Sequence, residues 1–215
     1  MFNLIVKDIL VQKRSLIAIL VYLLICVYSF KSMPSGTMLG LVTVTIVFFY
    51  ITGSYSYDER NKSHIVLNSL PITRKELIIS KYISVIIYNI IALSIMTLFM
   101  FSSKILNLPL TIHFFTLNDI VNVFITSLLL ASFVFPVYSK FGYTKSRVVT
   151  FITYFTFFTI VNVLSNISDK KTINIFSSFL QALSNNTYIL LIIALVIYIL
   201  SMYFCIKIYV NKELD

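Results

Sequence analysis

Long apolar runs separated by short polar stretches form the main pattern along this chain. Six runs are long enough to cross a bilayer, because about 20 apolar residues span its hydrocarbon core as a helix. None of the six contains Asp, Glu, Lys, Arg or His, and the short first and fifth runs are expected to continue into their polar flanks. The predicted spans are residues 15–30, 38–57, 82–103, 120–138, 148–164 and 188–206.

The longest polar interruption is residues 58–81, between the second and third predicted spans. It holds five of the 17 basic residues and three of the 8 acidic ones. Pro71 disfavours helix at the residue before it, while Thr73 and Glu76 have the spacing of a helix capping box. We therefore predict a helix that begins at Arg74 and continues without a break into the third span.

A weaker capping-box match, Ser56 with Glu59, lies at the start of the same interruption. Asp58 and Glu59 adjoin Arg60, and we interpret the two carboxylates as part of a solvated loop. Between the two capping boxes lies an amphipathic piece too short to span. Its apolar residues need cover from the membrane surface, the underside of the bundle or a partner protein: Ile65, Val66, Leu67 and Leu70.

Residues 1–14 precede the first span and have an amphipathic pattern. One side of a helical wheel collects Phe2, Ile5, Val6, Ile9 and Leu10, whereas Asn3, Lys7 and Arg14 lie opposite, and Leu4 and Val11 break the pattern. Such a helix is expected to lie along the membrane surface. The alternative is that it extends the first span.

Three later features carry expectations of their own. Pro136 should kink the fourth span near its end. Residues 166–186 include an apolar stretch and are predicted to be a re-entrant or interfacial segment. The fifth span carries polar residues spaced by three, interpreted either as side chains bonded to their own backbone or as a helix contact or partly wet cavity: Thr150, Thr153, Thr156, Thr159 and Asn162.

Basic residues are distributed unevenly between the two sides of the predicted membrane domain. Thirteen Lys and Arg fall on the side of the two termini, the 58–81 interruption and the loop after the fourth span, against four on the other side. Because Lys and Arg concentrate in cytoplasmic loops, we expect both termini and residues 58–81 to lie in the cytoplasm. An even number of spans agrees with that topology.

The composition supports a single membrane domain over residues 1–215. The chain is 59% hydrophobic and 12% charged, whereas soluble domains carry about 25% charged residues. The net charge of +9 is typical of cytoplasmic loops facing anionic headgroups, so no nucleic-acid partner is expected. Cys26 and Cys205 lie within apolar segments and are interpreted as small buried hydrophobes.

Several kinds of chemistry have no counterpart in the sequence. Four glycines, at 36, 40, 53 and 142, cannot form a phosphate-binding loop, so we expect no nucleotide site and no cofactor on this chain. His64 and His113 stand alone, and no catalytic or metal-binding residue is predicted. A proton-coupled carrier normally places an ionisable residue at membrane depth, and the predicted spans have none. A transporter built on this chain would take its energy from elsewhere.

The segment from Glu59 to Tyr82 resembles the loop that follows the second helix in ABC-2 type permeases, the membrane subunits of bacterial ABC exporters. The resemblance extends to the amphipathic N-terminus and the six spans. Lys62 and Ser63 depart from a glycine or threonine that many relatives have there. The residues that match the family pattern are Glu59, Leu67, Ser69, Leu70, Pro71, Ile72, Arg74, Glu76, Lys81 and Tyr82.

This resemblance implies a pathway formed by two permease chains above two cytoplasmic ATPase subunits, which bind the ATP and Mg²⁺. It also implies that the loop helix seats in a groove on each ATPase. The expected docking residues are Glu59, Ile65, Val66, Leu67, Ser69, Leu70, Pro71, Arg74 and Glu76.

Within the family, the chain is similar to exporters of cytolytic or antimicrobial peptides in staphylococci and other low-GC Gram-positive bacteria, those of phenol-soluble modulins among them. We thus expect a hydrophobic or amphipathic substrate and a bacterial plasma membrane location. The alternative hypothesis is an immunity or sensor protein that binds a partner in the bilayer without transport.

Overall fold

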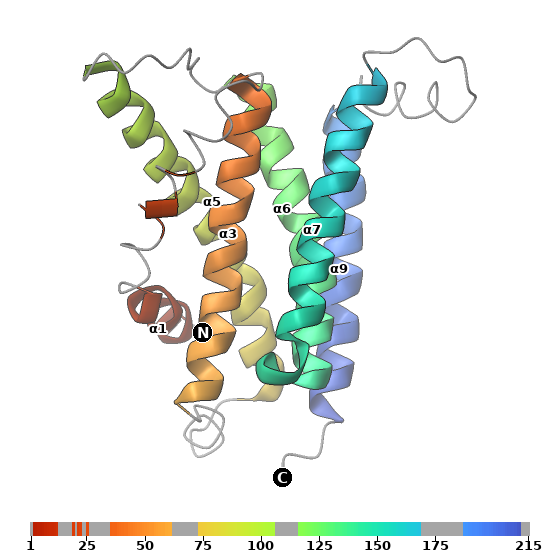
Figure 1. Ribbon diagram of the computed structural model, residues 1–215. Helices are drawn as coiled ribbons and strands as arrows, with labels where there is room; N and C mark the ends of the chain where they lie inside the picture. The colour runs from red at the N-terminus through yellow and green to blue at the C-terminus, as the bar shows by residue number, and fades with distance from the viewer. Residues whose placement is uncertain are drawn as a thin grey trace.

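The computed structural model describes residues 2–12, 19, 21–22, 25, 35–61, 73–105, 116–168 and 187–211. Within these ranges every regular element is a helix, as the sequence predicts. The helices are α1 (Phe2–Val11), α3 (Ser35–Arg60), α5 (Arg74–Ile105), α6 (Leu117–Phe141), α7 (Tyr143–Ser168) and α9 (Thr187–Val210) (Figure 1).

The five long helices run side by side, and α6 occupies the centre of the bundle. It packs against α3, α5, α7 and α9, with its most extensive contact against α9. The short helix α1 is seen nearly end-on in Figure 1, so it runs across the bundle rather than along it, packed against α3 and α5. This is the orientation that a helix at the membrane surface would have.

Four of these helices are long and apolar enough to cross a membrane, namely α3 from Gly40 onward, α5, α6 and α9. The chain is therefore a multi-pass helical membrane protein. The predicted fifth span coincides with α7, which is not among the four, and the predicted first span lies almost entirely outside the described residues. Six spans, and the orientation in the membrane, stay predictions.

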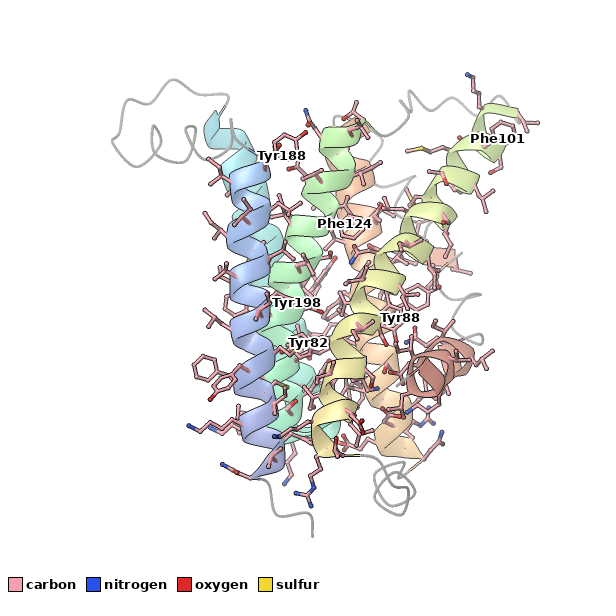
Figure 2. The ribbon with its side chains drawn as sticks, turned by 180° about the vertical axis from the view of Figure 1, so that it is seen from behind. Tyr82, Tyr88, Phe101, Phe124, Tyr188 and Tyr198 are labelled. Carbon is pink, nitrogen blue, oxygen red and sulfur yellow. The ribbon has the colours of Figure 1, made fainter. Side chains whose placement is uncertain are left out.

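Aromatic and aliphatic side chains fill the interior of the bundle. The largest fully buried ones include Phe48 of α3, Tyr82 and Tyr88 of α5 and Phe135 of α6, and Figure 2 shows Tyr82 and Tyr88 on the same helix. Cys205 is buried, as expected, and Cys26 lies outside the described residues. The outer face of α9 carries exposed apolar side chains over most of its length, as a helix surrounded by lipid would.

The threonines of α7 bond mainly to their own helix. Thr153 donates to the Val149 carbonyl oxygen, and Thr156 and Thr159 each donate to the carbonyl three residues earlier. This agrees with the first of the two interpretations of the polar residues spaced by three. Thr150 differs, because its hydroxyl also lies 2.9 Å from the Tyr138 hydroxyl of α6.

One end of the bundle collects nearly all described basic residues. We call it the charged end; here α3, α6 and α9 finish and α5 and α7 begin. Of the ten Lys and Arg in the described ranges, nine lie at this end, and Lys104 lies at the other. The two sides that the sequence distinguishes by charge are therefore two physical ends of the described bundle.

Candidate functional site

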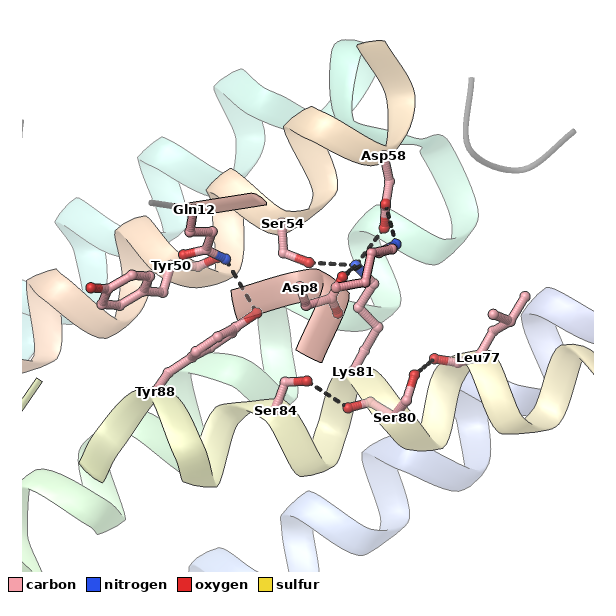
Figure 3. A network of polar contacts seen from close by, with 11 residues as sticks. Asp8, Gln12, Tyr50, Ser54, Asp58, Leu77, Ser80, Lys81, Ser84 and Tyr88 are labelled. Atoms are coloured by element: carbon pink, nitrogen blue, oxygen red, sulfur yellow. Dashed lines mark hydrogen bonds and ion pairs between the residues drawn. The ribbon is translucent and has the colours of Figure 1, made fainter. Parts of the chain in front are cut away.

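Four charged side chains meet at the charged end, where α1, α3 and α5 converge (Figure 3). Lys81 of α5 places its Nζ 2.5 Å from Asp58 Oδ2 and 3.2 Å from Asp8 Oδ1. Lys7 of α1 places its Nζ 2.6 Å from Asp58 Oδ1 and 3.3 Å from Asp8 Oδ1. Each ammonium therefore contacts both carboxylates, and we call these residues the four-charge cluster.

The cluster is balanced in charge and largely withdrawn from water. Asp8 is 3% exposed and Lys81 13% exposed, and a charge at such a depth is costly unless it is paired. Burial by itself would lower the pKa of Lys7, but the Asp58 and Asp8 carboxylates outweigh it and raise that pKa above its ordinary value. Lys7 thus stays cationic, and the cluster keeps two positive and two negative charges.

Further polar contacts extend the cluster into the bundle. Lys81 also donates to the Ser54 hydroxyl and lies over the Tyr55 ring. Directly after α1, Gln12 donates from Nε2 to the Tyr50 carbonyl oxygen at 2.6 Å and to the Tyr88 hydroxyl at 3.2 Å. Polar contacts therefore join the C-terminal half of α1 and the residue after it to both α3 and α5.

The side of α1 that faces the bundle coincides only in part with the apolar side expected from the sequence. Leu4, Ile5, Asp8 and Gln12 are buried and Ile9 packs against the core, while Leu10 is 65% exposed. Residues four apart share a face of a helix, so Leu4, which appeared to break the amphipathic pattern, belongs to a bundle-facing stripe that also carries two polar residues. Their partners lie on α3 and α5, which the pattern of α1 alone cannot show.

The start of α5 confirms the predicted capping box. The Thr73 amide donates to Glu76 Oε2 at 2.9 Å, and the Glu76 amide donates to Thr73 Oγ1 at 3.3 Å. The helix begins at Arg74, as predicted. Arg74 reaches the far end of the chain, where its Nη1 donates to the Val210 carbonyl oxygen of α9 at 3.2 Å.

Two interpretations of the segment before Arg60 are wrong. Ser56 cannot cap a helix at its start, because α3 continues through it to Arg60. Asp58 and Glu59 do not form a solvated loop, since both lie in the last turn of α3 and bind other helices. Their partners are distant in sequence, so the local polar pattern suggested a loop.

Glu59 binds the beginning of α7. Its carboxylate accepts the Tyr143 amide at 2.5 Å, the Thr144 amide at 3.1 Å and the Thr144 hydroxyl. A carboxylate at a helix N-terminus satisfies unpaired amides and interacts favourably with the helix dipole. Gly142, which joins α6 to α7 with φ of +77°, brings those amides toward Glu59.

Adjacent residues of α3 therefore connect it to three other helices. Asp58 contacts α1 and α5 through Lys7 and Lys81, and Glu59 contacts α7. Residues 62–72 connect the end of α3 to the start of α5. We call residues 62–72, which hold six of the nine predicted docking residues, the docking segment. The structure fixes both flanks of this segment relative to the rest of the bundle.

Of the predicted docking residues, the structure describes three. Glu59 and Arg74 bind α7 and α9, and Glu76 closes the capping box of α5. The other six lie in residues 62–72, outside the described residues: Ile65, Val66, Leu67, Ser69, Leu70 and Pro71. The sequence pattern does not identify Asp8 and Gln12 as buried residues. The signal that could have found them is their spacing, because Leu4, Asp8 and Gln12 are four residues apart and so share one face of a helix.

Comparison with known families agrees with a membrane transport architecture. The family described as ABC-2 family transporter protein matches residues 3–210. The chain belongs to this family, and it is thus a permease component of the ABC transporter class, whose members work with ATPase subunits in the membrane. No curated protein and no solved structure matches it.

Proposed function

We propose that this chain is the membrane subunit of an ATP-driven exporter and that a separate ATPase binds residues 62–72. The observation that carries the proposal is the four-charge cluster, which joins the end of α3 to the start of α5 by the ion pair of Asp58 with Lys81. A segment held at both ends in this way can transmit a push from a bound partner, because its two supporting helices move together with it.

The distribution of charge supports a cytoplasmic position for this end. Nine of the ten described basic residues lie at the charged end, and Lys and Arg concentrate on the cytoplasmic side of membrane proteins. In this proposal both termini are cytoplasmic, the membrane is a bacterial plasma membrane, and ATP and Mg²⁺ bind to the partner ATPase.

We further propose a hydrophobic or amphipathic substrate, with peptide toxins or antimicrobial peptides as the favoured class. The described helices offer apolar side chains and hydroxyls at membrane depth, whereas their buried charges are confined to the paired cluster at one end. A second permease chain, either another copy or a sister subunit, completes the pathway.

The test is purification of the tagged chain from its native membrane in mild detergent. We expect an ATPase to copurify, ATP hydrolysis by the complex, and stimulation of that hydrolysis by amphipathic peptides after reconstitution into vesicles. Copurification of a bilayer partner without any ATPase would instead support the immunity or sensor hypothesis and overturn the proposal.

A further inference from the structure

Helix α6 contains a backbone carbonyl that cannot be satisfied within the helix. Pro136 has no N–H, so the carbonyl oxygen of Ser132, four residues earlier, has no intrahelical donor. The Ser201 hydroxyl of α9 donates to that oxygen at 2.6 Å. Since the site is buried, this bond replaces the missing one where water cannot.

The same Ser201 hydroxyl contacts α5. Its oxygen lies 2.9 Å from the Tyr82 hydroxyl. A serine hydroxyl has a single proton, and that proton points to the Ser132 carbonyl, so Tyr82 is the donor in this pair. The resulting chain of hydrogen bonds runs from Tyr82 through Ser201 to Ser132 and joins α5, α9 and α6.

Tyr82 is held firmly in place at this junction. Its ring lies 4.6 Å from that of Phe135 and 4.9 Å from that of Tyr198, and the Tyr198 hydroxyl donates to the Tyr82 carbonyl oxygen at 2.8 Å. Figure 2 shows Tyr82 and Tyr198 close together on neighbouring helices. A shift of α5 by a fraction of a turn would break these contacts together.

Tyr82 directly follows Lys81 of the four-charge cluster. These two consecutive residues connect α5 in different directions, Lys81 to α1 and α3 and Tyr82 to α6 and α9. Continuous contacts therefore lead from the base of residues 62–72 to the point where α6 lacks the hydrogen bond that Pro136 cannot donate.

We propose that Tyr82 and Ser201 are positioning residues that transmit movement of the docking segment to a hinge in α6 at Pro136. This inference rests on the proposed function. It assigns the transmission step to specific hydroxyl groups, and it predicts that the step fails when either hydroxyl is removed.

The first part of the test needs no ATPase. In the wild-type background, Ser201→Ala leaves the Ser132 carbonyl unpaired and should raise the equilibrium constant for unfolding in detergent about tenfold. Pro136→Ala restores an N–H for that carbonyl, so in its presence Ser201→Ala should raise the constant less than about threefold. An equal effect of Ser201→Ala in the two backgrounds would overturn the proposal.

The second part uses the complex with its copurified ATPase in vesicles, with a fluorescent amphipathic helical peptide as the probe. Tyr82→Phe and Ser201→Ala should retain ATP hydrolysis while peptide transported per ATP falls at least about fivefold, and Ser201→Thr, which keeps the hydroxyl, should retain transport. An unchanged ratio in Tyr82→Phe would overturn the positioning role. Failure of the wild-type complex to form would instead count against the proposed function, and the unfolding result would still decide the local hydrogen-bond argument.

Discussion

Asp58 and Lys81 form an ion pair of 2.5 Å that joins the last turn of α3 to the second turn of α5. The 22 residues between them include the whole of the predicted docking segment. Lys7 and Asp8 of α1 complete the arrangement, so three helices share one balanced set of charges. A partner that moves residues 62–72 would have to move these helices as a unit.

The cluster should show strong coupling between its members. Asp58→Asn leaves two ammoniums with one carboxylate, and Lys81→Met leaves two carboxylates with one ammonium. We expect each to lower the free energy of unfolding by about 2 kcal/mol, because both break a partly buried pair. The double variant retains Lys7 with Asp8 as a neutral pair. Its loss in free energy of unfolding should therefore be smaller than the sum of the two single losses by about 1–2 kcal/mol. Chemical unfolding in detergent measures this, and additivity within about 0.5 kcal/mol would contradict it.

Glu59 should protect the first amides of α7 from exchange with solvent. Glu59→Gln removes the charge that interacts with the helix dipole and replaces one acceptor oxygen by an amide NH₂ donor, at a cost of about 1 kcal/mol. Hydrogen exchange of the Tyr143 and Thr144 amides should accelerate about fivefold. Asp119→Asn is the matched control, because Asp119 caps α6 at the opposite end, and its effect should be confined to that end. Unchanged exchange at Tyr143 and Thr144 in Glu59→Gln would exclude the capping role.

Gly142 should tolerate no side chain without strain. Its φ of +77° and ψ of 168° lie in a region populated almost only by glycine. An added Cβ would lie 3.5 Å from Glu59 Oε2, which is an ordinary contact, so the strain comes from the backbone conformation alone. Gly142→Ala is expected to lower the free energy of unfolding by about 2 kcal/mol. Gly40→Ala provides the comparison, since that glycine is helical and its added Cβ would make an ordinary contact with Val123. Equal stability of the two variants would count against the strain argument.

The capping box of α5 should affect both local stability and partner binding. Thr73→Ala removes the acceptor for the Glu76 amide and should destabilise the first turn by about 1 kcal/mol. Because residues 62–72 extend from this turn, the affinity for the ATPase should fall about fivefold, whereas Thr73→Ser should retain it. Titration of the solubilised chain with purified ATPase measures the difference. Equal affinities of Thr73→Ala and the wild type for the ATPase would show that the capping box does not contribute to ATPase binding.

Local signals in the sequence predict the long helices and the start of α5. The start of α5 at Arg74 follows from Pro71, Thr73 and Glu76, which lie close together in the chain and act on each other. The apolar runs likewise predicted the long helices, since lipid imposes a length and a composition on each.

The polar contacts between helices could not be predicted in the same way. The partners of Glu59 lie more than 80 residues later, and Asp8 of α1 binds Lys81 of α5. A charged residue in a short polar stretch suggests solvent unless its partner is known, so the sequence favours a loop at Asp58 and Glu59. The buried side of α1 could not be predicted for the same reason, because the partners of Asp8 and Gln12 lie on α3 and α5.

The most direct test of the account is copurification of the ATPase with a variant of the docking segment. Leu67→Asp combined with Leu70→Asp places two charges on the apolar face of that segment, and Leu117→Asp at the opposite end, where Leu117 is 82% exposed, is the matched control. We predict that the double variant inserts into the membrane at the wild-type level but loses the ATPase, while Leu117→Asp retains it. Wild-type recovery of the ATPase with the double variant would contradict docking through residues 62–72.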